Sequence, residues 1–130
     1  MSNKKSQKKP TDAEMAIIAV IWERGPSTVR EVFKHLSERQ EIGYTTVLKL
    51  MQIMTEKGSL ERDTSIRPQV FKATQPQQQT QRQLLRDLLD RAFDGSPGDL
   101  VLQALSARKT TPEERRQIRE LLDRLEREGS

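Results

Sequence analysis

The chain has 130 residues, of which 33% are hydrophobic and 32% charged, with no Cys and a single His, His35. This length fits one domain of ordinary size, or a small domain with an oligomerisation arm. Without thiolates or an imidazole cluster we expect no metal site and no cofactor. No apolar run reaches the roughly 18 residues that span a bilayer, and no signal-peptide pattern occurs, so we expect a cytoplasmic protein without membrane insertion.

The net charge of +4 comes entirely from the start of the chain. Residues 1–10 contain four Lys and no acid, whereas residues 11–76 and 77–130 each hold equal numbers of bases and acids. We expect residues 1–10 to form a disordered basic tail. Two roles stay open for it, a solubilising segment and an arm that seeks phosphate groups.

Two short amphipathic helices are predicted next. Thr11 and Glu14 form a capping box, and a Gly-Pro pair ends the following apolar pattern, so the first helix is expected over 12–24. Ser27 is expected to cap a second helix over 28–38. The expected buried residues are Met15, Ile18, Ile21 and Trp22 in the first helix, and Val29, Val32, Phe33 and Leu36 in the second.

A third helix is predicted over 45–57, capped by Thr45 or Thr46 and ended at Gly58. Its two faces differ in chemistry, because residues are spaced by about 100° around a helix. The inward face carries Val47, Leu50, Met51 and Met54. The outward face carries Thr45, Lys49, Gln52 and Glu56, with Thr46 near its N-terminus and the apolar Leu48 and Ile53 on its flanks.

A β-hairpin is predicted after these helices. Residues 60–63 and 70–73 have the pattern of short strands, joined by a loop with Arg67 at its tip, and Pro68 keeps one strand at an edge. Three helices followed by a hairpin is the order of a winged helix-turn-helix domain, which we place at 11–76.

The second half of the chain is rich in Leu and predicted to be helical. Residues 75–83 contain six Gln and no apolar side chain, which marks a boundary or the polar first turn of a helix ending near Gly95. A short helix around 100–105 follows, and then a longer one that starts with Thr111 as its N-cap, Pro112 at its first position and Glu114 completing a capping box. Their apolar side chains are too few for an independent core, so we expect 77–130 to form a helical dimerisation region. Folding back onto the first half is the alternative.

The fold class expected is therefore mainly α with a small hairpin wing, and the function expected is binding of double-stranded DNA. Small polar groups on the third helix suit base edges in the major groove, and cations on the wing suit phosphates. The candidate DNA-binding residues are Thr45, Thr46, Lys49, Gln52, Arg62 and Arg67. The candidate dimer-interface residues are Leu84, Leu85, Leu88, Leu89, Phe93, Leu100, Leu102, Leu105, Ile118, Leu121, Leu122 and Leu125.

Other functions have less support. These polar faces are alternatively ordinary solvated surfaces, or the domain is a protein-protein adaptor without specific DNA binding. The acid pairs Glu113-Glu114 and Asp87-Asp90 are interleaved with Arg on helices, which is typical of solvated side chains, and no nucleophile or phosphate-loop motif occurs, so we expect no enzyme.

Several segments resemble one protein family. The runs PTDAEM, GPSTVREV, YTTVLKLMQIMTEKGSLERD and GSPGDLVLQAL are similar to the penicillinase repressors of the BlaI/MecI/CopY type, over about residues 10–125. The resemblance implies a homodimeric winged-helix repressor that occupies a palindromic operator. It also implies that Thr45 and Thr46 open the recognition helix and that the C-terminal helices form the dimer arm.

The chain departs from this family at two regulatory features. β-Lactam-responsive members are cut at an Asn-Phe bond by a membrane sensor and protease system, and the equivalent pair here is Gln103-Ala104. Copper-responsive members carry Cys-x-Cys motifs, and this chain has no Cys. Both departures argue against these release mechanisms.

Overall fold

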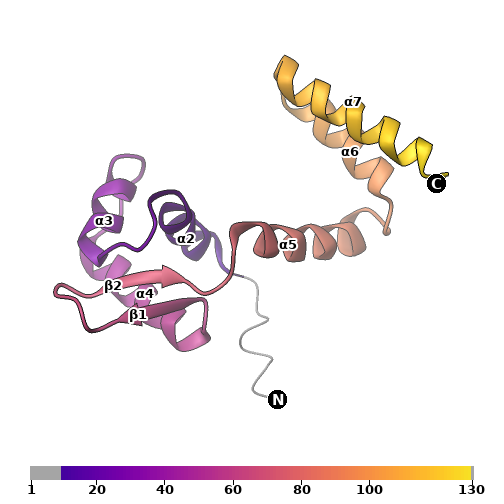
Figure 1. Cartoon of the computed structure of the whole chain (residues 1–130). Helices are drawn as coiled ribbons and strands as arrows, with labels where there is room; N and C mark the ends of the chain where they lie inside the picture. Colours follow the sequence, from indigo (N-terminus) through magenta and orange to yellow (C-terminus); the bar gives the residue numbers. More distant parts are fainter. Residues whose placement is uncertain (1–9, 130) are drawn as a thin grey trace. The chain divides into compact units, whose positions relative to one another are not determined.

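The computed structural model describes residues 10–129, so nine residues of the predicted basic tail lie outside it. In this described part of the chain, three helices precede an antiparallel hairpin and three more helices follow it, which confirms the predicted fold class (Figure 1). The elements are α2 (Asp12–Arg24), α3 (Val29–Ser37), α4 (Tyr44–Lys57), β1 (Leu60–Asp63), β2 (Val70–Ala73), α5 (Gln77–Ala92), α6 (Pro97–Ala107) and α7 (Pro112–Arg127). The chain divides between Leu84 and Leu85 into two compact units, and the predicted domain ranges 11–76 and 77–130 stay predictions.

The first unit has one hydrophobic core shared by α2, α3, α4 and the hairpin. Figure 1 shows the hairpin in front of α4, with α2 and α3 above it. Leu60 of β1 and Phe71 of β2 close the core from the strand side. The buried apolar residues are Ile17, Ile18, Val20, Ile21, Val29, Val32, Leu36, Val47, Met51, Met54, Leu60 and Phe71.

The predicted helix faces are largely confirmed. In α4, Val47, Met51 and Met54 are fully buried and Leu50 is partly buried. In α2, however, the buried face also includes Ile17 and Val20, which the sequence interpretation left out. The helix is apolar over more than half of its circumference, so spacing alone did not define which side faces α3 and the strands.

Two predicted helix caps are wrong. Thr28 caps α3 in place of Ser27, and its hydroxyl accepts a hydrogen bond from the Glu31 amide at 3.1 Å. Ser27 is fully buried instead, because its amide and carbonyl pair with those of Phe71 at 3.0 and 2.8 Å and extend the sheet. In the second case Gly43 precedes α4, which starts at Tyr44 without a side-chain cap, so neither threonine caps it.

A buried ion pair joins the start of α2 to the end of α4. Glu14 lies in the first turn of α2, and its carboxylate oxygens accept hydrogen bonds from Lys57 Nζ, in the last turn of α4, at 3.0 and 2.9 Å. The Glu14 side chain is only 4% exposed and that of Lys57 25% exposed. Since Oε1 also accepts from the Thr11 amide, the capping box of α2 and the end of α4 are tied together.

The second unit consists of the end of α5 and of α6 and α7. The Gln-rich segment forms the first turns of α5, and α6 is longer than predicted because Ser96 caps it and Pro97 occupies its first position. Thr111 and Glu114 form the capping box predicted for α7. No residue of 85–129 is buried. Within the described residues, no helix is both long and apolar enough to cross a membrane.

Candidate nucleic-acid interface

The outward face of α4 is polar and open. Thr45, Thr46, Lys49 and Gln52 are all exposed, whereas the opposite side of the helix is buried in the core. The flanking Leu48 and Ile53 are partly buried, and Leu48 packs against the core. The helix therefore presents hydroxyl, ammonium and amide groups to solvent over about two turns, as the sequence predicted.

A groove of about 520 Å³ lies between α3, α4 and the hairpin. Gln52, Arg62 and Arg67 of the candidate DNA-binding set line it, whereas Thr45, Thr46 and Lys49 do not. The remaining lining residues are Thr28, Val29, Arg30, Glu31, Lys34, Tyr44, Leu48, Pro68, Gln69 and Phe71. The structure thus separates the candidate residues into an exposed helix face and a cation-lined groove beside it.

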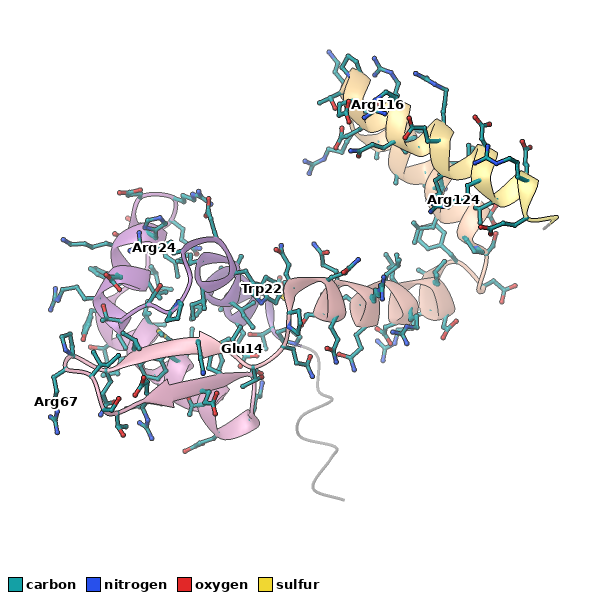
Figure 2. All side chains as sticks on the ribbon, in the orientation of Figure 1. Glu14, Trp22, Arg24, Arg67, Arg116 and Arg124 are labelled. Atoms are coloured by element: carbon teal, nitrogen blue, oxygen red, sulfur yellow. The ribbon has the colours of Figure 1, made fainter. Side chains whose placement is uncertain are left out.

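The loop of the hairpin carries one wall of this groove. Figure 2 shows Arg67 at the far end of the loop, with its side chain pointing away from the helices. The loop begins with a local turn in which Asp63 Oδ1 accepts hydrogen bonds from the Ser65 hydroxyl at 2.6 Å and amide at 3.0 Å. These two hydrogen bonds lower the pKa of the Asp63 carboxyl below its usual value.

The sequence interpretation missed the two cations of α3 and the tyrosine of α4 that line the groove. Arg30 and Lys34 lie four residues apart on the exposed side of α3, and Tyr44 opens α4. The sequence signal for the two cations was their spacing of four residues, which places both on the face of α3 opposite to its buried stripe. Arg30 and Tyr44 are also in contact, with the guanidinium carbon 5.0 Å from the ring centroid.

Among the described residues that line the groove, Glu31 is the single acid, and it is engaged in local contacts. Glu31 Oε1 accepts a hydrogen bond from the Thr28 amide at 2.8 Å, and Oε2 lies 3.6 Å from an Arg24 nitrogen. The hydrogen bond from the Thr28 amide, with the charge of Arg24, holds the pKa of the Glu31 carboxyl below its usual value. Its negative charge is therefore partly offset at neutral pH, which leaves the groove cationic.

Glu31→Gln should make the free energy of unfolding of the domain less dependent on pH in the acidic range. Because the pKa of Glu31 is lower in the folded state, its ionised carboxylate stabilises the fold at neutral pH, and this contribution disappears as the pH falls through the folded-state pKa. We expect the variant to be less stable by about 0.5 kcal/mol at neutral pH, since Gln keeps the capping geometry and the site is solvent-screened. Urea unfolding at neutral and acidic pH measures this difference, and a difference that stays constant with pH would contradict it.

Most of the predicted dimer-interface residues are exposed to solvent in the single chain. Leu102 is 67% exposed and Leu122 55% exposed, although both are apolar. Leu85, Leu88, Leu105, Leu121 and Leu125 are exposed too, and Leu84, Leu89, Phe93, Leu100 and Ile118 are partly buried. Val101, which the prediction omitted, is also exposed. So many exposed aliphatic side chains are unusual for a monomer.

The structure also places the pair that the sequence analysis aligned with the cleavage site, and the single His. Gln103 and Ala104 lie within α6, exposed to solvent, and their equivalence to a cleavage site stays a prediction. His35 is partly buried on α3. Among residues 10–129, no group of three or more His, Cys, Asp or Glu side chains is placed to hold a metal ion.

The fold and the groove define a class of protein. Three helices sharing a core with a two-stranded hairpin, followed by further helices, make a winged helix-turn-helix protein with a C-terminal helical region. The sequence pattern of the penicillinase repressor family matches residues 10–124. The chain therefore belongs to the penicillinase repressor family.

Individual relatives are similar over a shorter stretch. Two of them are the proteins named transcriptional regulator BlaI in Mycobacterium tuberculosis, from strain CDC 1551 / Oshkosh and strain ATCC 25618 / H37Rv. Each is 40% identical to this chain over 48 residues, which are 36% of this chain and 35% of the relative. The matched stretch thus spans about a third of the length of these curated relatives.

Proposed function

We propose that the protein is a transcriptional repressor that binds a palindromic DNA operator as a homodimer and acts by occupying it. The observation that carries the proposal is the polar outer face of α4 beside a cation-lined groove, in a chain of the penicillinase repressor family. Thr45, Thr46 and Lys49 supply donors and acceptors of a size that suits base edges. Arg62 and Arg67 supply charge for the sugar-phosphate backbone next to them.

The exposed apolar side chains of α5, α6 and α7 support the homodimer. A second copy would cover the same residues on both chains, which is the ordinary way in which a short helical region completes its core. In a two-fold dimer the two α4 helices could occupy successive major grooves about 34 Å apart. The proposal therefore includes an operator with two inverted half-sites.

Selection of bound duplexes from a random DNA pool tests this function. We expect the full chain to enrich an inverted repeat whose half-sites are about one helical turn apart. Thr46→Ala should then weaken binding to the enriched duplex by roughly tenfold without lowering the melting temperature, because Thr46 is exposed. Fluorescence anisotropy with the labelled duplex measures the affinity.

Gln40→Ala provides a matched control, since Gln40 is an exposed polar residue of the same unit that does not line the groove. It should bind the duplex like the unchanged protein. Failure of the unchanged protein to enrich any sequence would overturn the proposed function. Full affinity of Thr46→Ala would remove Thr46 from the recognition surface.

A further inference from the structure

The first turn of α4 is held by aromatic contacts and not by a cap. Helices α2, α3 and α7 each start with a capping box, whereas Gly43 offers α4 no side-chain acceptor. In its place, the Tyr44 ring meets the Phe33 ring edge to face, with centroids 5.8 Å apart and planes at 89°. Since Phe33 packs against the core, this contact ties the first turn of α4 to α3.

The other partner of the Tyr44 ring is a charged group. The Arg30 guanidinium carbon lies 5.0 Å from the Tyr44 ring centroid, so the ring holds a cation. Among residues 10–129, no carboxylate and no carbonyl accepts a hydrogen bond from this guanidinium. Its N–H donors are therefore available, although the side chain is already placed by the ring.

The surroundings of Arg30 select the chemistry of its ligand. Arg30 lines the groove together with Lys34, Arg62 and Arg67, and none of these four cations is paired with an acid within the described part of the chain. Among the described lining residues, Glu31 is the only acid that opposes these four charges, and its carboxylate is engaged by Thr28 and Arg24. A guanidinium that rests on an aromatic ring keeps its planar fork of donors for a tetrahedral or planar oxyanion.

We infer that Arg30 binds a phosphate of the DNA backbone and that Tyr44 is the positioning residue that aims its guanidinium into the groove. The inference rests on the proposed function and assigns two residues to it beyond the recognition face. The charge balance of the groove favours a polyanionic strand running between α3 and the hairpin over a neutral ligand. Tyr44 lies in the same first turn of α4 as Thr45 and Thr46. Its ring therefore connects the proposed phosphate contact of Arg30 to the residues proposed to contact the bases.

The test is a double-mutant cycle on the selected duplex, measured by anisotropy at several salt concentrations. Arg30→Gln should weaken binding roughly 10- to 100-fold for a dimer with two such contacts, and should lower the slope of log affinity against log salt by about 2. Tyr44→Leu should weaken binding as well, and in this background Arg30→Gln should have an effect of less than about threefold. Tyr44→Phe, which keeps the ring, should stay within about threefold of the unchanged protein.

The controls separate this inference from the function itself. Arg39→Gln removes an exposed Arg of the same unit outside the groove and should leave both affinity and salt slope unchanged.

An Arg30→Gln variant with an unchanged salt slope would overturn the phosphate contact, even if its affinity fell. Additive effects of Arg30→Gln and Tyr44→Leu would overturn the positioning role. A further measurement titrates inorganic phosphate into the unchanged protein without DNA. Phosphate that binds the groove at millimolar concentration and displaces the duplex would assign the site to a free anion instead. If the unchanged protein selects no duplex, the proposed function fails before this cycle begins.

Discussion

Lys57→Met should lower the free energy of unfolding by about 2 to 3 kcal/mol, because it leaves the Glu14 carboxylate buried without a counter-charge. The substitution keeps the aliphatic stem and removes only the ammonium group that both Glu14 oxygens contact. Among the partners of Glu14 in residues 10–129, the hydrogen bond from the Thr11 amide would remain. Urea unfolding measures the change, at one fixed protein concentration because the stability of the proposed dimer would depend on concentration.

Two comparisons make this prediction specific. Lys72→Met breaks the cross-strand pair with Glu61, which is 3.6 Å apart with both side chains more than half exposed, and it should change stability by less than about 0.5 kcal/mol. In a Glu14→Gln background, where no charge is left unpaired, Lys57→Met should cost clearly less than in the unchanged protein. Equal losses for Lys57→Met and Lys72→Met would contradict the role of the buried pair.

Leu88→Asp should convert the proposed homodimer to monomers. Leu88 is 47% exposed in the single chain, so a carboxylate is tolerated there when the chain is alone. In a two-fold dimer the substitution places two carboxylates in an apolar interface, which we expect to raise the dimer dissociation constant at least about a hundredfold. Sedimentation equilibrium measures the molecular mass, and circular dichroism checks that the helical content is retained.

Gln83→Asp is the matched control for the dimer prediction. It introduces the same side chain on the same helix, but on the exposed face opposite to the Leu residues, and should leave the dimer intact. A Leu88→Asp variant that stays dimeric at micromolar concentration would show that other surfaces make the contact. Loss of the dimer in both variants would point to a change in α5 itself.

The sequence predicted those parts of the fold that depend on local signals. The capping boxes at Thr11 and Thr111 and the left-handed Gly58 each act within a few residues, and all three occur where they were expected. The cap at Ser27 was wrong because a partner distant in sequence, Phe71, uses the Ser27 backbone for sheet pairing. The capping preference of a residue depends on its neighbours in sequence, so it cannot predict pairing with a distant strand residue such as Phe71.

The candidate site was predicted in part for the same reason. Helical spacing was enough to find the exposed face of α4, and hairpin signals were enough to put Arg67 in a loop. The contact of Arg30 with Tyr44 depends on how α3 packs against α4, and nothing in the spacing of either helix specifies it. The groove therefore could not be predicted from the sequence, because it forms only where α3, α4 and the hairpin pack together.

The salt dependence of affinity for the selected duplex tests the central claim most directly. A repressor dimer that contacts several phosphates should lose affinity by orders of magnitude between about 50 and about 200 mM salt, with a linear plot of log affinity against log salt. A protein-protein adaptor with an apolar contact surface would select no duplex and would bind its partner with little change over this range. Sequence-specific binding with a steep salt slope is the result expected here, and the absence of any salt-sensitive, sequence-specific DNA binding would contradict it.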